Sequence, residues 1–541
     1  MQRFAQLLDD LSTQQGRNAK IALMEAYFRT TPDPDRGWAL AALTEAAPLK
    51  VPLRRLLTSL MQSRIDLFLY KVSRDYVGDT AETVALLWPG KTPEGDVAGK
   101  LSLAGVIQRI QDCPPDQLEA TTAGMLDRFD ITERWAFLKF LGGALRVGVS
   151  ARLAKIALAQ TAKCDLSEID EVWHALTPPY CDLFAWLEGR APRPTTKGLA
   201  VFRPLMLATP IEDHDWRALV PRDFAAEWKW DGIRVQIASE DAGVRIFSRT
   251  GEDISPAFPE ISEAFAHLNV TVDGELLVVR NNVVASFNDL QQRLNRKSVS
   301  GRMLGEYPAH VRLYDLLMIA GEDLRSLSFD ERRRRLENWH SSVSPALTDV
   351  SELITFTAFD ELAELHASAR GASIEGLMLK RRASPYLAGR PKGHWFKWKR
   401  TALTLDCVLM YAQRGSGKRS SFYSDYTFGV WRTIGKAQPE LVPVGKAYSG
   451  FTDAELKDLD KFIRQNTIET FGPVRSVKPE IVFEVAFDSV QLSKRHKSGI
   501  AMRFPRIHRI RWDKPAREAD TLATAVALLD DASRPESAAT S

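Results

Sequence analysis

The chain has 541 residues, of which 45% are hydrophobic and 26% charged, so it is too long for one hydrophobic core and has the composition of a folded protein of about three domains. The net charge is only +3, so any nucleic-acid binding must use local basic patches. The four cysteines form no Cys-x-x-Cys pair, which excludes a zinc ribbon, and no apolar run is long enough to span a bilayer. The first residues lack a signal-peptide core, and we expect a cytoplasmic protein.

Residues 1–190 have apolar side chains at helical spacing. Phe4, Leu7, Leu8 and Leu11 form one such set, and the apolar run 135–141 ends in two glycines, which is a helix stop signal. No convincing alternating strand interrupts this part of the chain. We therefore predict an all-α domain over 1–190, followed by a linker at 191–198 that is rich in proline and small polar residues.

The pattern of residues changes after the linker. Between 200 and 400, short β-branched and aromatic runs such as 244–247 alternate with helical stretches such as 330–336, which predicts an α+β domain built on antiparallel sheets. Beyond residue 400, spaced strands at 404–411, 426–431 and 481–487 predict a small all-β barrel over 401–530. Residues 531–541 have nothing to bury and are expected to be a disordered tail.

Lys229 carries the strongest chemical signal. It lies between Glu227 and Asp231-Gly232, at the end of a predicted strand. A lone Lys-x-Asp-Gly is usually a solvated turn, but here it is the first of six ordered elements. The other five are at 248–251, 273–275, 314–317, 375–380 and 395–399. In order and content the six elements resemble the nucleotidyltransferase motifs of ATP-dependent DNA ligases.

The resemblance implies a role for each of several side chains. Lys229 would be the residue that becomes adenylated, Glu227 would read the amino edge of adenine, and Tyr314 would stack on the base. Many relatives have phenylalanine in place of Tyr314, and either ring can stack. The contacts to ribose and phosphates, including the 5′-phosphate of the nick, would come from Arg234 and Arg249, and the nucleotide phosphates would be held by Arg390 and Lys397.

The chemistry of a lysine nucleophile adds further expectations. The amine attacks a phosphorus atom only when neutral, so we expect Mg²⁺, Lys397 and Lys399 nearby to favour the neutral form. Glu275 and Glu375 follow predicted strands and are the carboxylates best placed to hold the metal, because Mg²⁺ usually takes one or two protein carboxylates together with substrate phosphates. Composition alone would make each of them a surface acid, and their positions within the motif set reverse that reading.

Basic residues mixed with aromatics near the C-terminus suit contact with DNA phosphates. They occupy 494–499 and 503–514. The second segment also resembles the last ligase motif, in which Arg511 and Lys514 would orient the triphosphate. Segments 77–82 and 142–150 resemble the N-terminal DNA-binding domain of multidomain ligases, and 204–208 also fits the family.

Two other basic runs give weaker evidence of function. Residues 415–419 superficially resemble a phosphate-binding loop but depart from its pattern, and we interpret them as a basic loop of the barrel. The four consecutive arginines 332–335 lie on a predicted helix, where neighbouring residues point in different directions. We interpret them as a solvated face rather than a DNA patch.

The resemblance implies a multidomain chain: an all-α DNA-binding domain, an α+β antiparallel nucleotidyltransferase (adenylation) domain and a C-terminal all-β oligonucleotide-binding (OB-fold) barrel. The expected activity is nick sealing in duplex DNA with ATP and Mg²⁺, through lysyl-AMP and 5′-adenylated DNA, by a monomer. The alternatives are an RNA ligase, a capping guanylyltransferase or a non-catalytic DNA clamp. DNA repair, replication and recombination are the expected settings, and the sequence does not distinguish among them.

Overall fold

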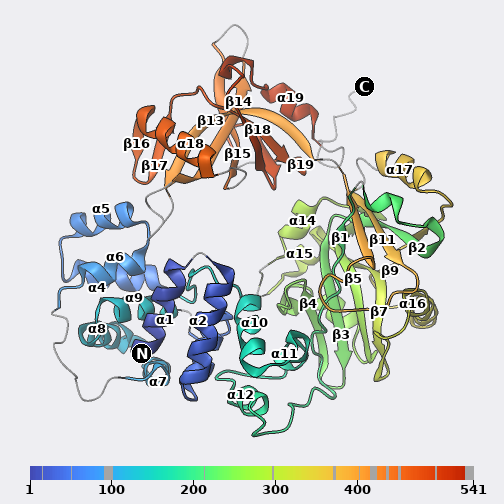
Figure 1. Ribbon diagram of the computed structural model, residues 1–541, viewed down its shortest axis with the longest axis horizontal. Coiled ribbons are helices and arrows are strands. Elements are labelled where there is room, and N and C mark those ends of the chain that lie inside the picture. Colours follow the sequence, from blue (N-terminus) through green and yellow to red (C-terminus); the bar gives the residue numbers. More distant parts are fainter. Residues whose placement is uncertain are drawn as a thin grey trace. The chain divides into compact units, whose positions relative to one another are not determined.

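The computed structural model describes residues 1–14, 16–49, 51–90, 101–212, 214–294, 296, 298–368, 373–400, 402–414, 423–433, 438–448, 453–493 and 496–529 (Figure 1). These residues group into two compact units. One unit takes in Met1–Leu166, Leu176–Pro194 and Leu403–Leu528, and the other is built mainly from Ser167–Ala175 and Thr195–Ala402. The predicted basic loop at 415–419, the predicted tail at 531–541, and Lys494 and Arg495 lie outside the described residues.

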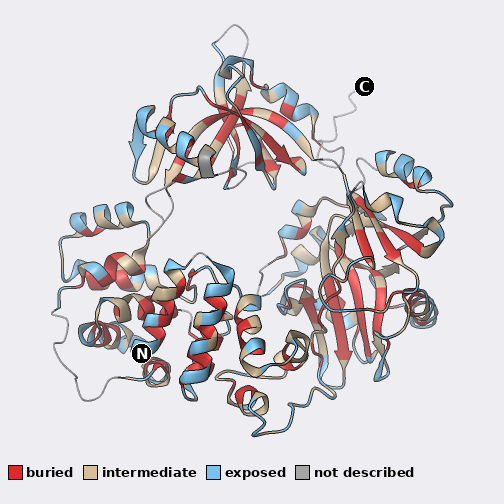
Figure 2. Ribbon diagram, viewed as in Figure 1, coloured by how far each residue is buried: buried red, intermediate tan, exposed pale blue. Residues whose placement is uncertain are grey.

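The first unit begins with a helical region, as the apolar spacing predicted. Phe4, Leu7, Leu8 and Leu11 are buried on one side of the first helix. Figure 2 shows the same division into a buried and an exposed side on α2. The helices are α1 (Gln2–Thr13), α2 (Arg17–Thr30), α3 (Asp35–Leu43), α4 (Leu53–Gln62), α5 (Leu67–Val77), α6 (Thr80–Leu87), α7 (Leu103–Gln111), α8 (Leu118–Arg128), α9 (Ile131–Leu141), α10 (Ala151–Ala162) and α12 (Cys181–Leu187).

Helix α9 is the centre of this region. A reciprocal capping box of Asp130 and Glu133 begins it, and the Phe140 ring packs edge-on against Phe4 of α1 with centroids 6.1 Å apart. Lys139 of α9 forms an ion pair with Asp79, which also caps α6. The buried amine of Lys20 donates hydrogen bonds to the carbonyls of residues 147 and 148, at 2.7 and 3.0 Å. Both segments that resemble the ligase DNA-binding domain are thus anchored to helices.

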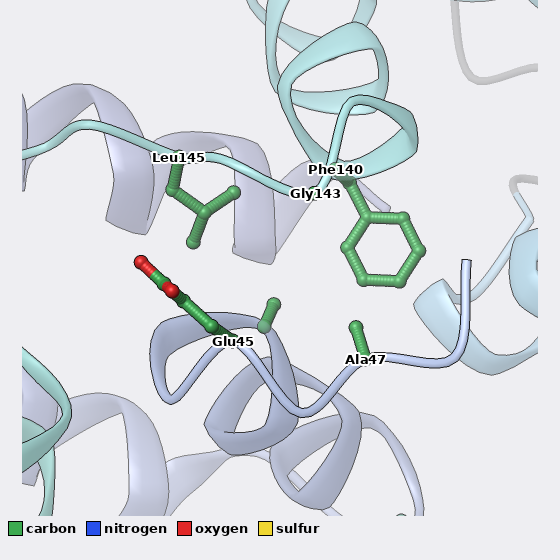
Figure 3. Close-up of a pocket in the computed structure, with 6 residues that line it drawn as sticks. Glu45, Ala47, Phe140, Gly143 and Leu145 are labelled. Carbon is green, nitrogen blue, oxygen red and sulfur yellow. The ribbon is translucent and has the colours of Figure 1, made fainter. Parts of the chain in front are cut away.

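A small pocket lies beside this anchored segment. It is lined by Ala42 and by the five residues labelled in Figure 3, namely Glu45, Ala47, Phe140, Gly143 and Leu145. Its volume of about 10 Å³ is about what a single water molecule needs, so it has no room for a nucleotide. The pocket is therefore too small to be the substrate site.

The second unit contains two sheets. The described residues form a five-stranded sheet in the order β1-β12-β11-β2-β10 and a larger sheet in the order β4-β3-β5-β7-β8, with β6 beside β5 and β9 beside β7. All pairs are antiparallel except β1 with β12 and β7 with β9. The strands are β1 (Thr209–Pro210), β2 (Phe224–Trp230), β3 (Ile233–Glu240), β4 (Gly243–Ser248), β5 (Val270–Arg280), β6 (Val283–Val284), β7 (Ala309–Ile319), β8 (Glu322–Asp323), β9 (Thr348–Val350), β10 (Leu353–Ile354), β11 (Ile374–Arg381) and β12 (Trp395–Lys399).

Helices cover the outer faces of these sheets. Val235 and Val272 of the larger sheet pack with Leu336 of α16, and Leu377 and Phe396 of the smaller sheet pack with a residue of α17. A third cluster takes residues from both sheets, so their inner faces meet. Figure 1 shows α16 beside β7. The helices are α13 (Pro259–Ala264), α14 (Phe287–Gln291), α15 (Gly301–Glu306), α16 (Phe329–Val343) and α17 (Phe359–Ser368).

Helix α11 (Leu166–Trp173) groups with the second unit although it precedes the linker. Glu171 forms an ion pair with Arg325 at 2.9 Å. The His174 ring lies 4.8 Å from Phe247 and 5.7 Å from Phe202, measured between centroids. These contacts fasten residues 167–175 to β4 of the larger sheet and to the segment after β8.

The C-terminal part of the first unit is an antiparallel sheet. Its longest strand, β13, pairs with β14 along one edge and with β17 and β18 along the other. The strands predicted at 404–411, 426–431 and 481–487 are confirmed. The elements are β13 (Leu403–Arg414), β14 (Tyr423–Arg432), β15 (Glu440–Ala447), α18 (Asp453–Gln465), β16 (Thr467–Phe471), β17 (Val474–Val477), β18 (Val482–Phe487), β19 (Ser489–Leu492), β20 (Ile500–Arg503), β21 (Arg506–Arg511) and α19 (Leu522–Ala527).

Across the part of the chain that the structure describes, no helix combines the length and the apolar character needed to cross a membrane.

Candidate active site

Lys229 lies near the end of β2, on the inner face of the smaller sheet. Alternate residues of a strand point to opposite faces, and Trp228 packs in the outer core with Phe396. Lys229 therefore faces the other way, together with Glu227 two residues before it. Trp228 thus points away from the lysine, as the sequence predicted, whereas the ring of Trp230 lies 4.2 Å from the guanidinium of Arg312 on β7 of the larger sheet. The Lys229 side chain retains 24% exposure, so the amine is reachable from solvent.

Two motif glycines allow the strands around Lys229 to approach closely. A Cβ at Gly232 would lie 2.6 Å from the carbonyl oxygen of Leu276 on β5. A Cβ at Gly376 would lie 2.1 Å from the carbonyl oxygen of Trp398 on β12, and Gly376 has a φ of +144°. Neither position can hold a side chain without moving its neighbours. The glycines after Lys229 and Glu375 thus set the close packing of the site.

Glu375 connects the nucleophile candidate to a second lysine. Its Oε2 lies 2.5 Å from Nζ of Lys229 and 3.3 Å from Nζ of Lys399. Burial alone would favour the neutral acid, but the attraction of and hydrogen bonds from Lys229, together with Lys399, hold the pKa of Glu375 well below its ordinary value. Glu375 is therefore an anion at neutral pH, available to a cation in the site.

Lys397 is the centre of a cluster of cations. Burial lowers its pKa from the ordinary value, and the nearby charges of Arg390, Lys399, Arg249 and Lys229 lower it further. The fold thus brings these predicted residues together, although they come from separate motifs of the sequence. Such a concentration of positive charge on one inner surface suits a polyphosphate.

Glu275 lies on β5, across from the smaller sheet. Burial raises its pKa to about 7, Lys229 opposes that rise, and the charge of Glu375 adds to it. The two glutamates are thus close enough to interact. In the described residues no group of three or more His, Cys, Asp or Glu side chains could hold a metal by itself. Two carboxylates fit Mg²⁺, which completes its shell with phosphate oxygens and water.

Tyr314 and Arg234 lie deeper between the sheets. The amine of Lys380 is 4.4 Å from the centroid of the Tyr314 ring. Arg234 donates hydrogen bonds to the carbonyl of Met206 at 2.6 Å and to Asp273 at 2.6 Å. These bonds hold the guanidinium inside the fold. The expected contacts of Arg234 with ribose and phosphates therefore stay a prediction.

Glu227 is held by two cations that sequence reasoning missed. Nη1 of Arg333 lies 3.1 Å from Oε1 of Glu227, and Nζ of Lys380 lies 2.8 Å from Oε2. The side chains of all three residues are at most 6% exposed. Lys380 was within a recognised motif without a role, whereas Arg333 belongs to the run 332–335.

The interpretation of that run as a solvated face is wrong for two of its four residues. The side chain of Arg332 is fully buried against Asp315, and Arg333 is 6% exposed, whereas Arg334 is 62% exposed. Helical spacing in the sequence already indicated that these two arginines are buried. Arg332 and Arg333 lie three and four positions after Phe329, on the same helical face as other buried side chains of α16, namely Leu336 and Trp339.

Arg511 and Lys514 belong to the C-terminal sheet of the first unit. Nζ of Lys514 lies 2.7 Å from Oδ2 of Asp406, and Nη1 of Arg511 lies 3.3 Å from the same atom. Arg511 also pairs with Asp513 at 2.9 Å. Asp406, which sequence reasoning did not single out, therefore gathers both cations of the last motif.

Comparison with known families matches two parts of this chain. The family model of the ATP dependent DNA ligase domain matches residues 205–399, and that of the ATP dependent DNA ligase C terminal region matches residues 419–514. The first match spans every residue of the Lys229 site named above. The second spans Arg511 and Lys514.

Individual relatives extend the likeness over nearly the whole chain. A probable DNA ligase of Koribacter versatilis (strain Ellin345) is 31% identical over 566 residues, covering 97% of this chain and 96% of that protein. DNA ligase 1 of Korarchaeum cryptofilum (strain OPF8) is 30% identical over 410 residues, covering 75% and 73%. The solved structure of Pmar-Lig_PreS3 has a similar fold, with a TM-score of 0.56, 16% identity, and coverage of 94% of this chain and 99% of that one.

Proposed function

Since this chain belongs to the ATP-dependent DNA ligases, we propose that Lys229 is the nucleophile through which it uses ATP. The protein is a ligase that forms phosphodiester bonds in DNA. One observation supports this assignment of the lysine above all. Lys229 is on the inner face of its sheet, beside Glu375 and among the cations Arg249, Arg390 and Lys397.

In the first step the neutral amine of Lys229 attacks the α-phosphorus of ATP. A P–N bond forms, the bond to the β-phosphate oxygen breaks, and pyrophosphate leaves with its electron pair. Negative charge grows on the departing group, and Arg390, Lys397 and Lys399 are placed to stabilise it. Glu227 and Tyr314 would hold the adenine base.

Glu275 and Glu375 would hold Mg²⁺ in this site. When bound, the ion would neutralise charge on the phosphates during attack. The two glutamates differ in protonation before it binds, since Glu375 is anionic and the pKa of Glu275 is about 7. Binding a divalent cation would therefore favour loss of the proton from Glu275.

In the second step the 5′-phosphate of a nick attacks the lysyl-AMP, which releases Lys229 and leaves DNA with a 5′-adenylate. In the third step the 3′-hydroxyl attacks the phosphorus of the nick, and AMP departs. We propose nicked duplex DNA as the substrate, held by the helical region, by the basic C-terminal segment and by a C-terminal sheet of the OB-fold type. A monomer in the cytoplasm would suffice for this reaction, which serves DNA repair and replication.

The test is to incubate the full chain with α-labelled ATP and Mg²⁺ and to separate the protein under denaturing conditions. We expect a labelled adduct that is labile in acid, and Lys229→Arg should abolish it because a guanidinium stays protonated. Lys392→Arg, at an exposed lysine on the loop before β12, is the matched control and should label normally. Full labelling of Lys229→Arg would show that another residue is the nucleophile. Labelling by GTP instead of ATP would favour a capping-type enzyme.

A further inference from the structure

We propose that Arg333 is a positioning residue that holds Glu227 as an acceptor for the 6-amino group of a purine and so sets the preference of the site for adenine. This inference rests on the proposed function, because it requires that the nucleotide bound beside Lys229 presents its base to Glu227. Arg333 is not part of any of the six motifs, and it is a member of the arginine run on α16.

Arg333, which lies on α16 and not in the sheet, fixes the Glu227 carboxylate through its contacts. Nη1 of Arg333 lies 3.1 Å from Oε1 of Glu227, Nη2 donates to the carbonyl of Ser351, and Nε donates to Glu337 at 2.6 Å. Every nitrogen of the guanidinium therefore has a partner. Because the planar group is bound at three places, it has little freedom to turn, and the oxygen of Glu227 is held in place with it.

Lys380 completes the arrangement from the neighbouring strand. Its Nζ lies 2.8 Å from Oε2 of Glu227. The same nitrogen is 4.4 Å from the ring centroid of Tyr314, 4.8 Å from that of Trp395 and 5.0 Å from that of Phe329. The aromatic rings confine the amine, so each oxygen of Glu227 has a separate, immobile cation.

These two cations determine what Glu227 can recognise. A carboxylate has about four acceptor sites, and Arg333 and Lys380 use two of them. With a cation against each oxygen, the carboxylate presents acceptor sites to the base and no donor. Such a group accepts from the 6-amino group of adenine and meets only an acceptor in the 6-oxo group of guanine. A buried acceptor left without a donor is costly, so guanine is rejected.

A purely structural role for Arg333 leads to a different expectation. If Arg333 only stabilised the fold, its loss would change the rate of nucleotidylation equally for all nucleotides. If Arg333 positions Glu227, its loss must reduce the advantage of the 6-amino group itself. Removing the Arg333 side chain and removing the 6-amino group of the nucleotide are the two changes of a thermodynamic cycle. The coupling energy between them is zero for a purely structural Arg333 and nonzero for a positioning residue.

The experiment measures the rate of covalent nucleotidylation of the full chain, in single turnover, against the concentration of ATP and of purine riboside triphosphate, which lacks the 6-amino group. The wild type should favour ATP by about 10- to 100-fold in rate at low concentration, as expected for a hydrogen bond to a charged group. In Arg333→Met the ratio should fall to about 3-fold or less. The loss should appear mainly in the half-saturating ATP concentration rather than in the maximal rate, and GTP should become a better substrate.

Arg334→Met is the matched control, because Arg334 is the next residue of the same helix and its ion pair with Glu331 is on the exposed side. It should keep the wild-type ratio. Arg333→Lys keeps the charge with fewer bonds and should give an intermediate ratio, which decides the matter if Arg333→Met does not fold.

Two outcomes overturn different claims. An unchanged ratio in folded Arg333→Met, or in Arg333→Lys where Arg333→Met does not fold, overturns the positioning role, and so does a wild type that does not discriminate against the analogue. Neither affects the assignment of Lys229. Absence of any adduct at Lys229 in the wild type would overturn the proposed function itself.

Discussion

Nζ of Lys229 lies 2.5 Å from Oε2 of Glu375, across the neighbouring strands β2 and β11. The proposed nucleophile and a proposed metal ligand therefore neutralise each other in the protein without nucleotide. An amine held in this ion pair is not free to attack phosphorus. It follows that Lys229 and Glu375 must separate before the first step, and that whatever binds Glu375 affects the reactivity of Lys229.

Glu375→Gln should slow adenylation even though it releases Lys229. The amide removes the anion that would hold Mg²⁺, and disturbing even the outer partners of a metal ligand commonly costs about 10- to 100-fold. We expect a loss of at least about 10-fold, partly restored by raising the Mg²⁺ concentration. Glu364→Gln, at an exposed glutamate of α17, is the control. Wild-type Mg²⁺ dependence in Glu375→Gln would show that Glu375 is not a ligand.

The raised pKa of Glu275 predicts a dependence of stability on pH. Its ordinary value is 4.5 and the folded value is about 7, so between these values the native state keeps a proton that the unfolded chain releases. The contribution of Glu275 to stability is therefore fully present below pH 4.5, falls as the pH rises to about 7, and changes no further above it.

Glu275→Gln cannot ionise and should escape this loss. Relative to the wild type it should gain about 1 to 3 kcal/mol between acidic and mildly alkaline pH. The measurement is the denaturant midpoint of both proteins at several pH values, in chelator and without nucleotide. A difference between the two that stays constant across pH would contradict the raised pKa.

Gly376→Ala should disturb the site directly. The added Cβ would lie 2.1 Å from the carbonyl oxygen of Trp398, and the backbone has a φ of +144°. We expect a loss of about 1 to 3 kcal/mol in stability and weaker labelling by ATP, because Glu375 precedes this glycine. Gly305→Ala is the control, since nothing lies within 4 Å of its Cβ position on α15. Equal stability of the two variants would show that β11 and β12 can separate without cost.

The parts of the site that depend only on residues close together in the chain could be predicted from the sequence. Lys229 and Trp228 were placed on opposite faces correctly because strand alternation acts between adjacent residues. The partnership of Glu227 with Arg333 spans 106 positions and depends on how α16 packs beside β7 and β9, which no local pattern contains. The burial of Arg333 was visible in helical spacing, but a run of four charges concealed it.

Helix α11 shows the same limitation at the scale of domains. Its period is helical like that of its neighbours, and the prediction placed it within 1–190. Glu171 of α11 and His174 just after it contact residues of the second unit. A boundary drawn at the linker therefore separates α11 from the sheet on which it packs.

Two truncations test this packing. A chain that starts at Ser167 keeps α11, and a chain that starts at Thr195 lacks it. Both should still be labelled by ATP and should join nicks poorly, because the helical region proposed to hold DNA is missing. The chain from Thr195 should unfold at a lower temperature, since Phe202 and Phe247 lose the ring of His174 and Arg325 loses its ion pair with Glu171. Equal melting temperatures would show that α11 contributes nothing to the unit.

Arg511 and Lys514 supply the last prediction, because both are bound to Asp406. If they act on the triphosphate, they must leave this carboxylate during the first step only. Pyrophosphate departure needs positive charge that the transfer of AMP to DNA does not. Arg511→Ala and Lys514→Ala should therefore slow adenylation by about 10²-fold or more, as the loss of one charge-stabilising contact commonly does.

A nick that already carries a 5′-adenylate separates the steps. Both variants should seal it at close to the wild-type rate, while an ordinary nick with ATP is sealed slowly. Asp406→Asn serves as the comparison, because it keeps both cations and removes the charge that holds them. It should not share the adenylation defect, and faster labelling would indicate that Asp406 restrains the motif. Equal losses on both substrates would make Arg511 and Lys514 contacts to DNA, since only a DNA contact is needed in every joining step.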